Sequence, residues 1–252
     1  MQIANIYPVK NQDLYKNEEF VMILAHLFKK GYYKPDSFNK NSYIIMDNGL
    51  YEEAQVSTSL QDIVDMADNS EFKIHELIIP DVLNDLRANI KMFEDNLMTV
   101  SRYDYRYRFM FVAQSQTIEE FREAIRYINQ YYGSKNLSVG VSKLCPFNRD
   151  NPEVIEIVKE CKFPVHYLGI KTTFKEVLPV KNIIRSCDTS QLAYIAKNEL
   201  VLPDSLIDYE RKGRRADGRG VEGVDIDLEF DNLDNDVLKE LQNRLEGEFG
   251  HE

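Results

Sequence analysis

Residues 42–69 read SYIIMDNGLYEEAQVSTSLQDIVDMADN, and the two halves of this stretch differ in hydrophobic pattern. The first half is a short apolar run of strand character that stops at Asp47-Asn48-Gly49. The second half, from residue 60, is amphipathic with helical spacing, and Ser59 before it is a suitable N-cap. The stretch therefore predicts a strand followed by a helix, with a carboxylate, an amide and a glycine where the strand ends.

The same alternation recurs along the chain. Thr117 with Glu120 three residues later is a capping-box signature, and Pro152 suits the first turn of a helix. Strands are predicted at residues 3–9, 42–47, 75–81, 108–114, 137–142, 164–170 and 182–188, with 200–203 (LVLP) as an eighth. Helices are predicted at residues 18–31, 59–69, 83–100, 117–133, 151–162, 173–180 and 189–198.

Strands that alternate with helices form a parallel sheet, and about eight such units over roughly 200 to 250 residues is the size of a (β/α)8 barrel. A doubly wound open sheet is the alternative, but the glycine-rich turn that often follows its first strand is missing from this sequence. We therefore expect an α/β fold with a TIM-like catalytic barrel over residues 1–205. Residues 206–252 hold a basic loop, an acidic segment and a final helix, expected to pack on the barrel or complete it.

The composition is that of an acidic globular protein. Its 31 basic and 42 acidic side chains give a net charge of −11, which opposes non-specific attraction to a polyphosphate unless the basic residues are concentrated. Three separated cysteines without a C-x-x-C pair indicate neither a disulfide framework nor a closed zinc site. No signal peptide or membrane span is recognisable, so the sequence predicts a soluble cytoplasmic protein with no cofactor and no metal.

Polar or small residues stand where most of the predicted strands end. Any one of them is explained by helix capping or by a turn. Together at one barrel mouth, however, three carboxylates would repel one another unless a ligand or a reaction requires them. The residues are Asp47, Asp81, Gln114, Gly140 with Ser142 and Lys143, Gly169, and Asp188.

Two kinds of chemistry use several carboxylates without clustered His or Cys. An all-oxygen site binds magnesium together with substrate phosphates. In glycosyl transfer, one carboxylate attacks an anomeric carbon while another moves a proton to or from the leaving group. The residue types and their spacing are compatible with both.

The strand ends also resemble those of the tRNA-guanine transglycosylases, particularly phage-encoded relatives that place 7-deazaguanine bases in DNA. The family has two aspartate-bearing strand ends, a strand ending in glutamine, a glycine segment lining the base pocket, a His-Tyr-Leu-x-Gly strand and a nucleophilic aspartate. The similar segments occur here in the same order between about residues 40 and 190. They are IIMDNGLYE (44–52), IIPDV (78–82), FVAQSQ (111–116), VGVSKL (139–144), VHYLGI (165–170) and IRSCDTS (184–190).

The resemblance implies a pentosyltransferase that exchanges guanine for a 7-deazaguanine through a covalent glycosyl-aspartate intermediate. Asp188 would be the nucleophile, and Asp47 would handle the proton on the leaving and entering bases. The edge of the base would be bound by Asp81, which accepts hydrogen bonds, and by Gln114, which serves O6. The remaining substrate-binding positions would be Asn48, Gly140 and Gly169.

Two departures from the family bear on the substrate. The tRNA enzymes carry a zinc site of clustered Cys and His near the C-terminus, and no such cluster follows Cys187. Asn48-Gly49-Leu50 also stands where the family has Ser-Gly-Gly. These features favour DNA, with a flipped or single-stranded guanine, and a free 7-deazaguanine as partners in the cytoplasm of a phage host. A homodimer is compatible with the sequence.

Three other functions stay open. One is tRNA-guanine exchange, and another is a non-catalytic barrel subunit that binds a deazaguanine or a nucleic acid for a partner enzyme. The third is a metal-assisted phosphate or sugar enzyme. The nucleic-acid contact is expected in the loop YERKGRRADGRG (209–220), although a solvated loop would have the same composition. Its basic residues are Arg211, Lys212, Arg214, Arg215 and Arg219.

Three residues outside the strand ends are assigned structural roles. His75 and His166 are expected to be packed or hydrogen-bonded histidines rather than ligands. Cys187, beside Asp188, is expected to be a small buried residue.

Overall fold

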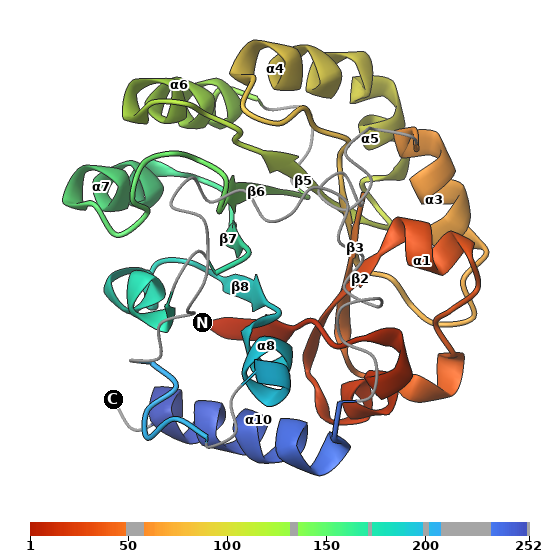
Figure 1. Cartoon of the computed structure of the whole chain (residues 1–252). Helices are drawn as coiled ribbons and strands as arrows, with labels where there is room; N and C mark the ends of the chain where they lie inside the picture. Colours follow the sequence, from red (N-terminus) through yellow and green to blue (C-terminus); the bar gives the residue numbers. More distant parts are fainter. Residues whose placement is uncertain (49–57, 132–135, 171–172, 199–201, 208–232, 251–252) are drawn as a thin grey trace.

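The protein is a barrel of eight parallel strands surrounded by helices (Figure 1). The computed structural model describes residues 1–48, 58–131, 136–170, 173–198, 202–207 and 233–250. The strands follow the order β1-β8-β7-β6-β5-β4-β3-β2, and β1 also contacts β2, so the sheet nearly closes. The predicted TIM-like barrel is confirmed. Its strands are β1 (Gln2–Asn5), β2 (Phe20–Leu24), β3 (Tyr43–Asp47), β4 (Glu76–Ile78), β5 (Arg108–Val112), β6 (Leu137–Ser142), β7 (Val165–Leu168) and β8 (Ser186–Thr189).

The helices lie on the outside of the barrel, between consecutive strands (Figure 1). Ser59 forms a capping box with Asp62, and the Thr117 hydroxyl accepts a hydrogen bond from the Glu120 amide, so both predicted N-caps are confirmed. The reciprocal half of the capping box predicted at Thr117 is not formed, because the Glu120 carboxylate accepts a hydrogen bond from the Gln116 amide instead. Pro152 is the first residue of its helix. The helical segments are η1 (Val9–Asn17), α1 (Ala25–Lys29), η2 (Pro35–Ser37), α3 (Leu60–Asp68), α4 (Leu86–Asp95), α5 (Leu97–Tyr103), α6 (Ile118–Asn129), α7 (Pro152–Glu160), η3 (Phe174–Val180), α8 (Gln191–Asn198) and α10 (Asn235–Gly250).

The prediction of one helix over residues 18–31 is wrong. Residues 20–24 (FVMIL) form β2, which is fully buried and pairs in parallel with β3, and only residues 25–29 are helical. A strand covered on both faces is apolar at every position, so its sequence cannot be told from a buried helix by periodicity. β2 is therefore the eighth strand. Of the segment expected to supply it, Leu202 and Pro203 are not in a strand, and residues 200–201 lie outside the described residues.

Two apolar cores hold the barrel together. The larger one fills the space between the strands and the surrounding helices. The smaller one fills the inside of the barrel, where alternate residues of each strand point inward. Its buried members are Ala4, Phe20, Met22, Ile45, Ile78, Met110 and Val112.

Gly140 of β6 lies where the inner core leaves no room for a side chain. A Cβ at this position would lie 2.7 Å from Cδ1 of Leu168 and 2.9 Å from Sδ of Met110. We expect Gly140→Ala to lower the free energy of unfolding by about 1–3 kcal/mol, because both neighbours must shift in a packed interior. The midpoint of urea unfolding measures this effect. Gly247→Ala is the control, since a Cβ there meets nothing within 4 Å and should be neutral or stabilising.

The C-terminal helix α10 packs on the barrel beside α8 and η1 (Figure 1). Its buried leucines join the outer core, and Nδ2 of Asn11 in η1 donates a 2.6 Å hydrogen bond to Oδ1 of Asn235. The carboxylate of Glu248 accepts hydrogen bonds from the backbone amides of Leu206 and Ile207. The Asn11 contact joins α10 to the first strand–helix unit, and the Glu248 contacts join it to residues 206–207.

Glu18 is a buried acid under the start of β2. Its Oε1 accepts hydrogen bonds from the Tyr7 hydroxyl (2.7 Å) and from Nδ2 of Asn5 (3.0 Å). Burial raises the pKa of Glu18 from 4.5 to about 7, although these hydrogen bonds counteract part of the rise. The folded protein therefore retains the proton that the unfolded chain has released, and the free energy of unfolding should fall as pH rises from about 4.5 to 7, by up to about 3 kcal/mol.

Glu18→Gln is expected to remove this pH dependence and to be more stable than the wild type near pH 8. Urea unfolding at about pH 5 and pH 8 measures the difference. Glu19→Gln is the matched control, because Glu19 is exposed. An identical loss of stability with pH in the wild type and in Glu18→Gln would contradict the prediction.

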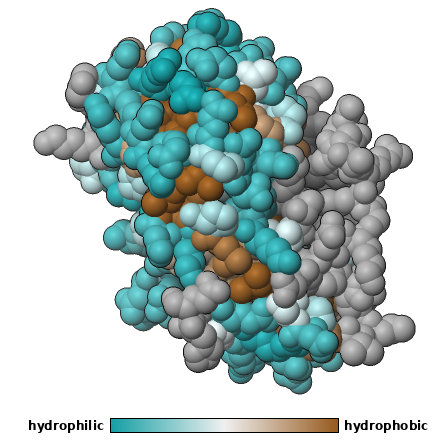
Figure 2. Space-filling view, turned by 90° about the vertical axis from the view of Figure 1, so that its left-hand side faces the viewer, coloured by the Kyte–Doolittle hydropathy of each residue, from teal (hydrophilic) through white to brown (hydrophobic). Residues whose placement is uncertain are grey.

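The face of the molecule shown in Figure 2 is mostly hydrophilic, with apolar residues gathered along its middle. Within the described ranges, no helix is both long enough and apolar enough to cross a membrane.

Candidate active site

The barrel brings the predicted polar residues to one rim, because parallel strands all end on the same side. Asp47 and Ser142 are the last residues of β3 and β6, and Asp188 lies one residue before the end of β8. Four more of the predicted residues follow strands β3, β4, β5 and β7 within three residues. They are Asn48, Asp81, Gln114 and Gly169.

Asp188 is buried at this rim with one carboxylate oxygen held in place. Only 5% of the residue is exposed. Its Oδ1 accepts a 2.8 Å hydrogen bond from the backbone amide of Gly169 and lies 3.0 Å from Nε2 of His166. Among the described residues, none donates a hydrogen bond to Oδ2. The carboxylate is therefore oriented through Oδ1, and Oδ2 is the oxygen available to a substrate.

Gly169 is a glycine for two structural reasons. Its φ of +65° lies in the left-handed region, and a Cβ would lie 2.5 Å from Cδ of Lys143. This conformation turns its amide toward Asp188 while its carbonyl accepts a hydrogen bond from Arg149. The structure therefore places Gly169 in contact with Asp188, a contact that its predicted role in the base pocket did not include.

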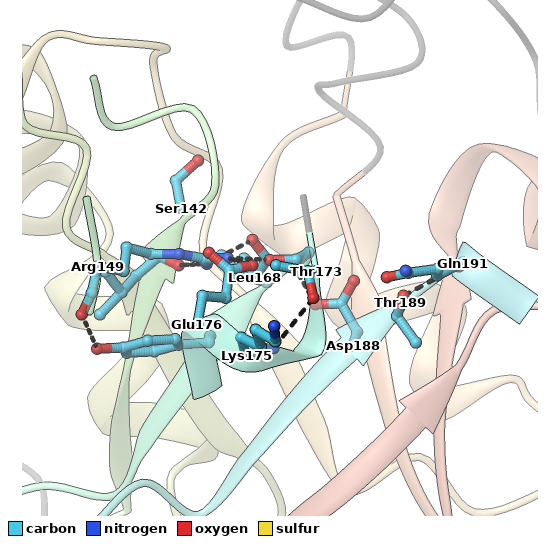
Figure 3. A network of polar contacts seen from close by, with 12 residues as sticks. Ser142, Arg149, Leu168, Thr173, Lys175, Glu176, Asp188, Thr189 and Gln191 are labelled. Carbon is cyan, nitrogen blue, oxygen red and sulfur yellow. Dashed lines mark hydrogen bonds and ion pairs between the residues drawn. The ribbon is translucent and has the colours of Figure 1, made fainter. Parts of the chain in front are cut away.

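Arg149, in the loop after β6, is a buried side chain that the sequence analysis did not single out. Its guanidinium donates hydrogen bonds to the carbonyls of Val141, Leu168 and Gly169, and it forms a 2.8 Å ion pair with Glu176 of η3 (Figure 3). Burial is the largest single influence on the pKa of Arg149 and would lower it, but the charge and hydrogen bond of Glu176 together with the nearby Tyr167 outweigh burial, and the pKa is raised. Arg149 thus ties the ends of β6 and β7 to η3 and supports the backbone beside Asp188.

A sequence contains little that would identify Arg149 in advance. An arginine between two predicted elements resembles any solvated loop arginine, and its partner Glu176 is 27 residues away within an amphipathic run. Only the neighbouring positions of β6 and β7 in the barrel bring the two charges together.

A second polar cluster at the rim consists of Asn48, Asp81 and Gln114. Oδ1 of Asp81 accepts a 2.7 Å hydrogen bond from Nδ2 of Asn48, and Oδ2 accepts one of the same length from Nε2 of Gln114. All three residues are buried. Burial raises the pKa of Asp81, and the two amide hydrogen bonds counteract part of that rise. The prediction that these residues come together is confirmed.

Gln114 carries a polar atom that the described residues leave unsatisfied. The residue is 3% exposed, and its Oε1 is buried without a hydrogen-bond partner among the described residues. An unpaired buried acceptor costs on the order of 1–3 kcal/mol. Such an atom is expected where a ligand supplies the missing donor. Nε2 of Gln114 donates to Asp81, so the atom left for a ligand is the acceptor Oε1. The resemblance had instead implied that the Gln114 amide donates to O6 of the base.

The other predicted residues differ in their positions. Asp47 is half-buried at the end of β3, opposite Leu24 of β2. Gly140 lies inside β6, packed against side chains of the inner core. Cys187 is fully buried, and burial followed by the charge of Asp188 raises the pKa of its thiol above the usual range, as expected for an inert packing residue.

The predicted nucleic-acid loop lies outside the described residues, with Arg211, Lys212, Arg214, Arg215 and Arg219. In the part of the chain that the structure describes, no three His, Cys, Asp or Glu side chains gather in a way that could hold a metal ion. No protein-family model matches this chain, and no curated protein matches it.

Proposed function

We propose that this protein exchanges a guanine base of DNA for a 7-deazaguanine through a covalent bond to Asp188. The observation that carries the proposal is the state of that carboxylate. One oxygen is oriented by the Gly169 amide and His166, and the other has no partner among the described residues. A buried, oriented carboxylate with a free oxygen has the properties of a nucleophile in glycosyl transfer.

The exchange needs two displacements at C1′ of the target nucleotide. In the first, Oδ2 of Asp188 forms a bond to C1′, the C1′–N9 bond breaks, and its electron pair stays on the base. Protonated Asp47 gives its proton to the leaving base. In the second, Asp47 takes the proton from the entering base, whose nitrogen attacks C1′ and releases the Asp188 carboxylate. One N-glycosidic bond replaces another, so no external energy source is required.

The Asn48–Asp81–Gln114 cluster supports binding of the base. The edge of a guanine-type base that carries N1 and the 2-amino group is rich in hydrogen-bond donors. A carboxylate accepts about four hydrogen bonds, so Asp81 retains acceptor capacity beyond its two amide partners. Gln114 Oε1 offers one more buried acceptor. The choice of DNA over tRNA rests on the resemblance of the sequence to the phage-encoded relatives, with Asn48-Gly49-Leu50 where the family has Ser-Gly-Gly.

Incubation with labelled guanine and either DNA or tRNA tests the proposal. We expect label to enter DNA without any nucleotide cofactor, and a protein–DNA adduct to be detected by intact mass after rapid quenching. Label in tRNA alone would assign the activity to the other substrate. Binding of a deazaguanine without exchange or adduct on either nucleic acid would support a non-catalytic binding subunit instead.

Asp47→Asn is expected to lower base exchange by roughly 10²- to 10⁴-fold, because an amide cannot pass a proton between the leaving and entering bases. Folding should change little, since Asn is nearly isosteric with Asp. Exchange kinetics and urea unfolding measure the two effects separately. Wild-type exchange by this variant would rule out the role assigned to Asp47.

A further inference from the structure

A chain of polar side chains crosses the apolar interior of the barrel and ends at Asp188. The end of this chain farthest from the mouth of the barrel is Glu76, the first residue of β4, which is completely buried. Glu76 accepts hydrogen bonds from the hydroxyls of Tyr43 (2.9 Å) and Ser138, and its Oε2 lies 2.7 Å from Nη1 of Arg185. Both carboxylate oxygens of Glu76 therefore have donors, and its charge is paired with that of Arg185.

The chain continues from Arg185 through β8 and β7. Nε of Arg185 donates a 3.2 Å hydrogen bond to Oγ of Ser186. Oγ of Ser186 lies 2.8 Å from Nδ1 of His166, and Nε2 of His166 lies 3.0 Å from Oδ1 of Asp188. The parallel register of the two strands sets these contacts, because His166 pairs with Ser186 and both side chains point into the barrel.

The direction of the hydrogen bonds follows from the two ends of this chain. The Asp188 carboxylate can only accept, so Nε2 of His166 carries the hydrogen that is donated to Oδ1. In the neutral ring Nδ1 is then an acceptor, and it receives the hydrogen of the Ser186 hydroxyl, whose oxygen accepts from Nε of Arg185. A doubly protonated ring would instead donate from Nδ1 as well, so that the Ser186 oxygen would face two donors and its own hydrogen would have no acceptor among these groups.

We propose that His166 is a positioning residue for Asp188, held by the Glu76–Arg185–Ser186 chain as the neutral tautomer with hydrogen on Nε2. In this form His166 fixes Oδ1 by a hydrogen bond without neutralising the carboxylate. Together with the Gly169 amide it directs Oδ2 toward the mouth and leaves the negative charge on the attacking group. The effect of this arrangement on reaction rate rests on the proposed transglycosylase function, but the tautomer of His166 can be measured whether or not the protein has that function.

Nitrogen NMR of the full-length protein with ¹⁵N-labelled histidine measures the tautomer directly. The chain has four histidines, and the signals that disappear in His166→Gln belong to His166. We expect an unprotonated Nδ1 and a protonated Nε2 near neutral pH, with this preference weakened in Ser186→Ala. A doubly protonated ring, or hydrogen on Nδ1, would overturn the proposal whether or not the protein exchanges bases.

Kinetics of base exchange measure the consequence. His166→Leu should lower kcat on the order of a hundredfold with little change in KM, because a misdirected nucleophile affects the reaction more than base binding. His166→Gln, which can donate to Asp188 and accept from Ser186, should restore most of kcat. His75→Leu is the control, because His75 accepts a hydrogen bond from the Ile44 amide at the opposite end of the barrel.

The results of these experiments distinguish the positioning role of His166 from the proposed base exchange. Wild-type kcat in His166→Leu, or equal losses in the Leu and Gln variants, would overturn the positioning role while exchange itself stands. A wild-type protein without exchange or adduct would overturn the proposed function, and the NMR measurement would still decide the state of His166.

Discussion

Asp188→Asn is expected to reduce base exchange by roughly 10⁴-fold or more and to abolish the covalent adduct. The amide oxygen of Asn can keep the hydrogen bonds from Gly169 and His166, but the group that replaces Oδ2 is an –NH₂ without nucleophilic character. Because these hydrogen bonds are kept, the fold should stay intact. Labelled-base exchange, intact mass of quenched reactions and urea unfolding measure these three properties.

Asp95→Asn is the control for a general effect of charge removal, because Asp95 is an exposed residue whose carboxylate forms a surface ion pair with Lys91. It should exchange bases at the wild-type rate. An adduct that persists in Asp188→Asn would show that another residue is the nucleophile. Magnesium-dependent turnover that never passes through an adduct would favour the metal-assisted alternative.

Arg149→Met is expected to have the largest effect on stability, lowering the free energy of unfolding by about 3–5 kcal/mol. The substitution leaves Glu176 as a buried charge without its partner and removes the donors to three carbonyl groups. It also removes the cation that lies 4.8 Å from the centre of the Tyr167 ring. Urea unfolding monitored by circular dichroism measures the loss.

A double variant separates the charge effect from lost packing. Replacing both Arg149 and Glu176 with Met should recover much of the stability, because no buried charge is then left unpaired. Arg122→Met is the surface control, since its ion pair with Glu153 is partly exposed and should contribute no more than about 1 kcal/mol. If Arg149→Met costs no more than Arg122→Met, the Arg149–Glu176 pair is not needed to hold β6, β7 and η3 together.

The barrel could be predicted because local patterns repeat along the chain. Amphipathic helices such as α3 and α6 show both their caps and their buried faces in the sequence. β2 could not be predicted, because FVMIL is buried on both faces and has no periodicity to distinguish strand from helix. Counting strand–helix units still gave the right architecture, although the eighth strand was placed at the wrong end of the chain.

The sequence alone indicated which residues reach the mouth of the barrel, since strand ends are local features and parallel strands all end on one side. Their partners were decided by the tertiary structure. Gln114 meets Asp81 across 33 residues, and His166 meets Asp188 across 22, through strand register. Hydrogen bonds between strands depend on which residues face each other after the sheet closes, and no local pattern in the sequence records that pairing.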